Sequence, residues 1–163
     1  MNKIVLLIVF CVAFKISHTQ NSSLFSADSI YDYAYNILKG LSITENGQCV
    51  KIYYDNKVEI IQILNELLQG LNEGKDITNL IFPIGMKFFG ISDLITKCQV
   101  LTLLDIYNRV STKDGIKEFG NTIYNNAETI YKLTNDLKNY KDYGDKLVVL
   151  GKLISIIFNF YVN

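Results

Sequence analysis

Hydrophobic residues recur every three or four positions along most of the chain, a spacing that places them on one face of an α-helix. The first such stretch begins after Ser26, a favourable helix N-cap, and is expected to end near Gly40. Further stretches lie at about 50–71, 76–88, 93–110, 112–137 and 146–161. The sequence therefore predicts an all-α bundle of five or six helices.

The same spacing predicts which residues face the core. For the second helix these are Val58, Ile61, Leu64, Leu68 and Leu71, and for the fifth they are Ile116, Phe119, Ile123, Ile130, Leu133 and Leu137. Pro83 should kink or restart the third helix, because proline cannot donate a backbone hydrogen bond. Gly115 and Gly120 disfavour helix over the first two turns of the fifth.

An internal repeat is indicated when the chain is shifted by 70 residues. Isoleucine and leucine positions then coincide, and Gly74 aligns with Gly144. Each copy reads as helix, glycine turn, helix, which is the pattern of an antiparallel helix pair. We expect two helical hairpins and an N-terminal helix.

Residues 1–19 have the pattern of a secretory signal peptide. Lys3 precedes an apolar run, and Ser17 and Thr19 provide small residues before a cleavage site at Gln20. The run of roughly a dozen residues is shorter than the ~20 needed to cross a bilayer. We expect a secreted or cell-surface protein with one helical domain at 20–163 and no transmembrane span in the mature chain.

Cleavage would leave 14 basic and 16 acidic residues, since Lys3 and Lys15 are lost from 16 of each. It would also remove the one histidine. This weakly negative balance excludes the basic surface of a nucleic-acid-binding protein. Asn21 begins the one N-glycosylation sequon in the sequence, Asn21-Ser22-Ser23. If the protein is a glycoprotein, its N-linked glycan is expected on Asn21.

Cys49 and Cys98 are expected to form a disulfide, because secretion exposes them to an oxidising compartment. Their midpoint falls at 73–74, where a glycine turn is predicted. Helices of equal length on either side of that turn would bring both sulfurs together at the open end of a hairpin. We therefore expect Cα atoms within about 7 Å of each other.

These cysteines also carry a resemblance to a known group of proteins. The pattern Cys49-x48-Cys98 occurs with Asp76-Ile77, Leu80-Ile81, Leu94-Ile95 and Lys97-Cys98. Over residues 45–100 this is similar to small secreted helical proteins that are abundant in ciliates. The resemblance implies helical architecture and secretion, and it assigns no functional residues.

Catalytic and metal-binding patterns are lacking in the mature sequence. Without histidine, neither a Ser-His-Asp triad nor a histidine-based metal site can form. Asp28 with Asp32, and Asp142 with Asp145, are the nearest paired carboxylates, but their positions at predicted helix starts suit dipole stabilisation. We expect a protein that is not an enzyme and needs no metal or cofactor.

Two apolar features leave alternatives open. Tyr31, Tyr33, Tyr35, Tyr53 and Tyr54 are interpreted as packing at the core edge with their hydroxyls in water, or as a sugar- or partner-binding surface. The spacing separates Tyr33 from Tyr31 and Tyr35.

The last helix, 146–162, is apolar on nearly every side, which is typical of a buried helix, a self-association or ligand surface, or an anchor signal.

Taken together, these features favour a secreted, non-enzymatic protein that acts as an extracellular structural or interaction component. A balance of 49% hydrophobic and 20% charged residues with one proline excludes a disordered or collagen-like chain. The alternative is a carrier that holds an apolar ligand or lipid in a cavity between helices.

Overall fold

The computed structural model describes residues 26–44, 47–91 and 93–162, and this part of the chain folds into nine helices. They are α2 (Ala27–Leu41), α3 (Gln48–Asp55), α4 (Lys57–Asn72), α5 (Ile77–Gly90), α6 (Leu94–Lys97), α7 (Val100–Val110), α8 (Lys113–Asn125), α9 (Ala127–Asn139) and α10 (Tyr143–Phe158). The all-α prediction is confirmed. The expected signal peptide at 1–19 and Asn21 lie outside the described residues.

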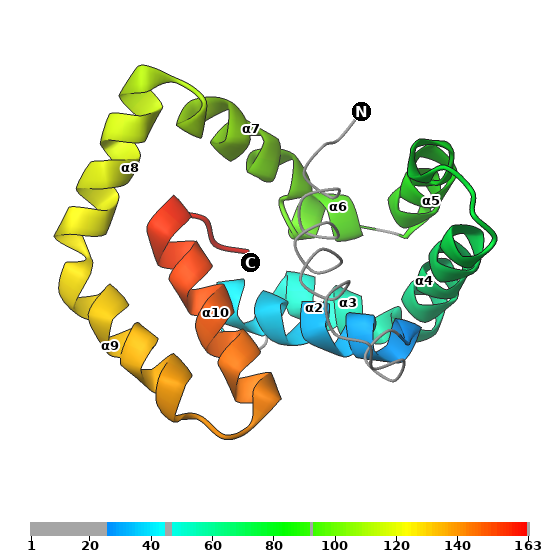
Figure 1. The fold of residues 1–163 in the computed structure, drawn as a ribbon, viewed down its shortest axis with the longest axis horizontal. Coiled ribbons are helices and arrows are strands. Elements are labelled where there is room, and N and C mark those ends of the chain that lie inside the picture. The colour runs from blue at the N-terminus through cyan, green and yellow to red at the C-terminus, as the bar shows by residue number, and fades with distance from the viewer. Residues whose placement is uncertain (1–25, 45–46, 92, 163) are drawn as a thin grey trace.

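The helices are arranged around a central crossing of α2 and α10 (Figure 1). On one side, α4 and α5 form a hairpin, and α4 also packs on α2. On the other side, α7, α8 and α9 follow one another in an arc around α10 (Figure 1). The arc contacts the rest of the molecule mainly through α10.

Three of the six predicted helices are each divided in two, which gives nine. The divisions fall at Asn56, after Cys98 at Gln99, and at Asn126. Gln99 has a φ of 50°, in the left-handed region that a continuing helix cannot use. At Asn56 the side-chain amide donates to the carbonyl oxygen of Ile52 (2.8 Å), a local bond that competes with regular helix.

The division at Asn126 repeats the division at Asn56 after 70 residues. The two asparagines have similar backbone angles (φ −101°, ψ 22° and φ −110°, ψ 14°). The Asn126 side chain also donates to a carbonyl oxygen four residues earlier, that of Thr122 (2.8 Å). A helix pair then follows each asparagine, α4–α5 and α9–α10. The predicted offset of 70 is thus visible as a repeated bend and hairpin.

The glycine turns of the two copies differ. Gly74 has a φ of 73° and forms the turn between α4 and α5, as predicted. Gly144 instead lies in the first turn of α10, because Asp142 caps that helix by accepting from the backbone N–H of Asp145 (3.1 Å). The last helix therefore begins three residues earlier than predicted.

Close contact between α2 and α10 depends on two glycines. A Cβ atom added at Gly40 would lie 2.0 Å from the carbonyl oxygen of Val148, and one at Gly151 would lie 2.3 Å from that of Ile37. The first helix ends at Leu41, next to Gly40 as predicted, and Gly40 also serves this crossing. The two backbones can therefore approach more closely than side chains would allow.

The last helix packs inside the bundle, which was one of its predicted interpretations. Its buried residues are Leu147, Val149, Gly151, Leu153 and Ser155. The chain after it stays buried at Phe160 and Val162, and the Val162 N–H donates to the carbonyl oxygen of Leu41 (3.1 Å). This bond fixes the C-terminal segment to the end of α2.

The predicted inward face of α4 needs correction. The buried residues are Ile60, Ile63, Leu64 and Leu67, so of the predicted set only Leu64 is fully buried. Val58 is 83% exposed and Leu71 is also exposed. The helix carries more apolar residues than one face holds, and contact with both α2 and α5 selects which of them are covered.

Two further expectations about helices also fail. Helices α8 and α9 contain no buried residue, although six of their residues were predicted to face the core. Phe119, Ile130, Leu133 and Leu137 are half-buried, and Ile116 and Ile123 are exposed. The helix does not restart at Pro83, since α5 continues through it from Ile77 to Gly90.

Candidate functional site

The disulfide joins the two halves of the first hairpin. Cys49 in α3 and Cys98 after α6 are bonded, with Cα atoms 4.7 Å apart, inside the predicted limit. Both residues are buried. The turn at Gly74 lies midway between them, so the predicted pairing and its geometric reason are confirmed. The bond holds the open end of the hairpin and offers no exposed thiol.

Tyr31 and Tyr53 form the centre of a tyrosine cluster between α2 and α3. Their rings stack with centroids 4.8 Å apart. The Tyr31 hydroxyl donates to the carbonyl oxygen of Tyr53 (3.2 Å), and the Tyr53 hydroxyl donates to that of Tyr31 (3.5 Å). Both side chains are buried, so the expectation that these hydroxyls reach water is wrong. Carbonyl oxygens on the facing helix satisfy them instead.

Burial changes the acidity of both hydroxyls. Loss of water raises the pKa of Tyr31 to about 12, and the nearby Tyr35 and Asp32 add to the effect. Burial likewise raises the pKa of Tyr53. Neutral hydroxyls that already donate to carbonyl oxygens are suited to holding α2 against α3.

The outer tyrosines extend the cluster toward solvent. Tyr35 stacks on Tyr31 with ring centroids 6.2 Å apart. The ring centroid of Tyr54 is 6.0 Å from that of Tyr35, and Tyr54 is exposed. The Lys57 ammonium lies 5.0 Å from the Tyr31 ring centroid, within cation–π distance. Tyr33 is separate, as predicted, and its ring packs against Tyr143. Most of the cluster is therefore internal packing.

The paired carboxylates have structural roles. Asp28 lies in the first turn of α2, and Asp142 caps α10 through the Asp145 backbone. The Asp32 carboxylate is 3.9 Å from the Lys57 ammonium. Among the described residues, no group of three or more histidine, cysteine, aspartate or glutamate side chains is placed to hold a metal ion.

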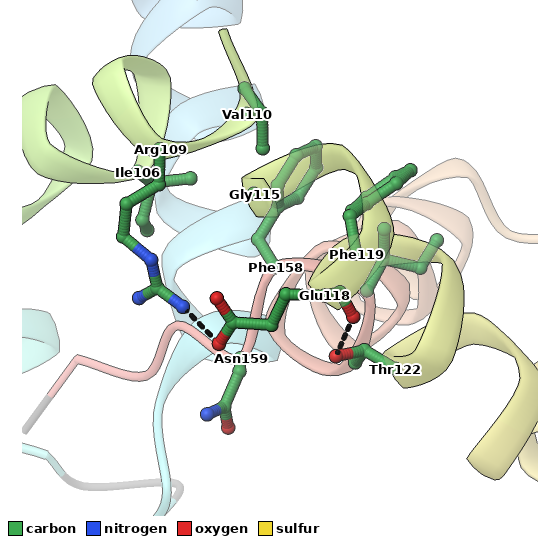
Figure 2. Close-up of a pocket in the computed structure, with 10 residues that line it drawn as sticks. Ile106, Arg109, Val110, Gly115, Glu118, Phe119, Thr122, Phe158 and Asn159 are labelled. Atoms are coloured by element: carbon green, nitrogen blue, oxygen red, sulfur yellow. Dashed lines mark hydrogen bonds and ion pairs between the residues drawn. The ribbon is translucent and has the colours of Figure 1, made fainter. Parts of the chain in front are cut away.

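A small pocket lies where α7, α8 and the end of α10 meet (Figure 2). Phe119 and Phe158 form its apolar wall, with ring centroids 5.4 Å apart. Arg109 and Glu118 form an ion pair at its rim. The pocket holds about 30 Å³, room for about one water molecule.

One exposed apolar surface lies on α5. Phe82, Met86 and Phe89, spaced by four and three residues, share one side of the helix and are 61%, 56% and 54% exposed. We call these three residues the α5 patch. Ile84 on another side of α5 is buried in the core, so the helix is apolar on more than one side. That all-round apolar character is the sequence signal by which the patch could have been found.

Within the described residues, no helix combines the length and apolar character needed to cross a membrane. Comparison with known proteins gave no match among protein-family models, curated proteins or solved structures.

Proposed function

We propose that this chain is a secreted, non-enzymatic protein that acts as an extracellular structural or interaction component. The observation that carries the proposal is the α5 patch, where large apolar side chains remain in contact with water. Contiguous exposed apolar residues are typical of surfaces that another protein covers. Aromatic and methionine side chains are also enriched in such interfaces.

Secretion is supported by the sequence and by the buried disulfide. A buried disulfide that links the two ends of a helical hairpin is typical of proteins that fold outside the reducing cytosol. The signal-peptide pattern at 1–19 and the resemblance to small secreted helical proteins of ciliates agree with that location. We propose membership of that group on the same residues.

The carrier alternative receives less support from the described part of the chain. A lipid or similar ligand needs a pocket of several hundred cubic ångströms that encloses most of its surface. The pocket between α7, α8 and α10 holds about 30 Å³. A larger hollow on α9 is open and lined by polar and charged side chains, including Glu128, Lys132 and Asp136.

The proposal is tested on the tagged full-length chain expressed in its secreting cell. We expect the protein in the medium or on the cell surface, and at a larger size in sizing chromatography than one chain would give. The variant Phe82→Ser/Phe89→Ser should reduce that size. The matched control Val58→Ser alters another exposed apolar residue, outside the α5 patch, and should leave the size unchanged.

Three results would contradict the proposal. Retention of the protein inside the cell would exclude an extracellular role. Lipid found by mass spectrometry in the purified protein, at one molecule per chain, would favour the carrier. Turnover in a hydrolase screen that one carboxylate substitution abolishes would identify an enzyme.

A further inference from the structure

The outer side of α8 presents a second apolar surface. Ile116, Gly120, Ile123 and Ala127 are spaced by four, three and four residues, which aligns them in one stripe. All four are exposed. The stripe passes the bend because Asn126 still takes part in helical bonding, donating to Thr122 and accepting from Ile130. Phe119 borders one edge of the stripe and turns inward to meet Phe158 (Figure 2).

Gly120 is unexplained within a single chain. Glycine inside a helix costs about 1 kcal/mol relative to alanine. Gly115 has a local reason, because an added Cβ atom would lie 1.8 Å from the carbonyl oxygen of Arg109. An added Cβ atom at Gly120 would meet no described atom within 4 Å. The space beside Gly120 is therefore open to another molecule.

The stripe is complementary to itself when one copy is reversed. Turning a second α8 about a point between residues 121 and 122 brings Ile116 opposite Ala127 and Ile123 opposite Gly120. Each large side chain then faces a small one, the arrangement that lets two helices interlock. A parallel pair in register would instead place each isoleucine against the same isoleucine.

The charges beside the stripe favour the same antiparallel arrangement. Lys113, Lys117 and Glu128 lie along one edge of it and make no ion pair within the described part of the chain. In the reversed pair, Lys113 and Lys117 of one copy lie on either side of Glu128 of the other. In a parallel two-fold pair this edge would instead face the opposite edge of the partner, and these charge pairs would not form.

We propose that a second copy of this chain docks on the outer face of α8 and the first turn of α9, forming an antiparallel, two-fold symmetric pair. The exposed rings of Tyr124 and Tyr131 lie beside the stripe and enlarge the contact. The stripe spans only residues 116–127, a smaller contact than the about 20–30 residues a side of a standard interface. The pair is therefore a weak, reversible dimer. This surface is separate from the α5 patch.

A charge exchange tests the dimer on the purified, disulfide-bonded secreted chain by sedimentation equilibrium over a range of concentrations. Lys117→Glu and Glu128→Lys should each weaken the dimer about tenfold, because each places like charges together. The double variant should restore it. Lys117 in α8 and Glu128 in α9 are eleven residues apart, about 16 Å at 1.5 Å per residue, so rescue requires contact between copies.

Lys141→Glu is the matched control, since it makes the same charge change at an exposed position after α9, outside the proposed contact, and should leave the dimer unchanged. A wild-type chain that stays monomeric at the highest soluble concentration would overturn the proposal. So would a double variant as weak as the single ones, or a control that weakens the dimer equally. A monomeric purified chain would leave the extracellular role intact, since that role is tested in the native medium through the α5 patch.

Discussion

Single glycines determine how closely α2 and α10 approach. We expect Gly151→Ala to lower the free energy of unfolding by about 1–3 kcal/mol, the usual cost of forcing an extra methyl group into a packed site. The added Cβ atom would lie 2.3 Å from the carbonyl oxygen of Ile37, and backbone atoms cannot rotate away as a side chain can. The free energy is measured by urea unfolding.

Gly85→Ala is the matched control for that substitution. It also lies inside a helix, but an added Cβ atom would meet no described atom within 4 Å. We expect it to raise stability by about 0.5–1 kcal/mol, because alanine loses less conformational entropy than glycine in a helix. Equal effects of the two substitutions would show that the helix crossing is not tight.

The buried Tyr31 hydroxyl should make the free energy of unfolding fall at alkaline pH. Its folded pKa is about 12, above the ordinary 10, so the unfolded chain ionises first. The contribution of neutral Tyr31 is complete below pH 10 and is lost as the pH rises toward 12. It amounts to about 2–3 kcal/mol at most, at 1.36 kcal/mol per pKa unit.

Tyrosinate absorbance measures this titration directly, since the chain contains no tryptophan. Native protein should show late-titrating tyrosines, and Tyr31→Phe should remove one of them. Tyr124→Phe, at an exposed position, should leave the late titration of Tyr31 unchanged. Titration of all tyrosines near pH 10 in the folded chain would contradict the buried, hydrogen-bonded pair.

At the scale of the helices, periodicity predicted where helix occurs better than where it is interrupted. The helix cap at Ser26 was predicted and is present, with its side chain accepting from the backbone N–H of Ser29. The divisions at Asn56 and Asn126 were missed because apolar spacing continues across them. Asparagine within a helical pattern, 70 residues apart in two aligned segments, was the available signal.

The buried faces were harder to predict than the helices themselves. When a helix has apolar residues on more than one side, the positions of the neighbouring helices determine which side is buried. Val58 and Leu71 fit the spacing but stay exposed, since α2 and α5 cover other sides of α4. The α5 patch was missed for the same reason. The disulfide was predictable because its two ends are fixed by a turn and by equal distances along the chain.

The disulfide should stabilise the first hairpin more than any single side chain. Closing a loop of ~50 residues contributes about 4 kcal/mol in the chain-entropy description. Cys49→Ser should therefore lower the free energy of unfolding by about 2–5 kcal/mol, with the loss largest in the first hairpin. Urea unfolding gives the total, and hydrogen exchange locates it.

Reduction of the wild-type protein removes the covalent bond and keeps both cysteine side chains, so it separates the effect of the crosslink from the effect of side-chain packing. The intact mass should rise by two hydrogens, and the reduced chain should lose nearly as much stability as Cys49→Ala/Cys98→Ala. Detection of Cys49 or Cys98 as a free thiol in the untreated protein would contradict the bond between them.

At the scale of the whole molecule, burial is unevenly distributed. The fully buried side chains gather around α2, α3 and α4, and around α10 where it crosses α2. The α8–α9 arm has no buried residue and is held mainly by half-buried contacts with α10 and α7. In the repeat α9 is the counterpart of α4, but it packs mainly on α10, whereas α4 packs on both α5 and α2.

Hydrogen exchange should follow this distribution. Amides of α2, α4 and α10 should exchange last, because they open only when the core unfolds, and those of α8 and α9 should exchange earlier through local opening. The measurement is made by mass spectrometry on a dilute sample, where dimer formation is negligible. A concentrated sample should then slow exchange in α8 and the start of α9 and leave α5 unchanged. Uniform exchange across all helices in the dilute sample would show that the arm unfolds together with the core.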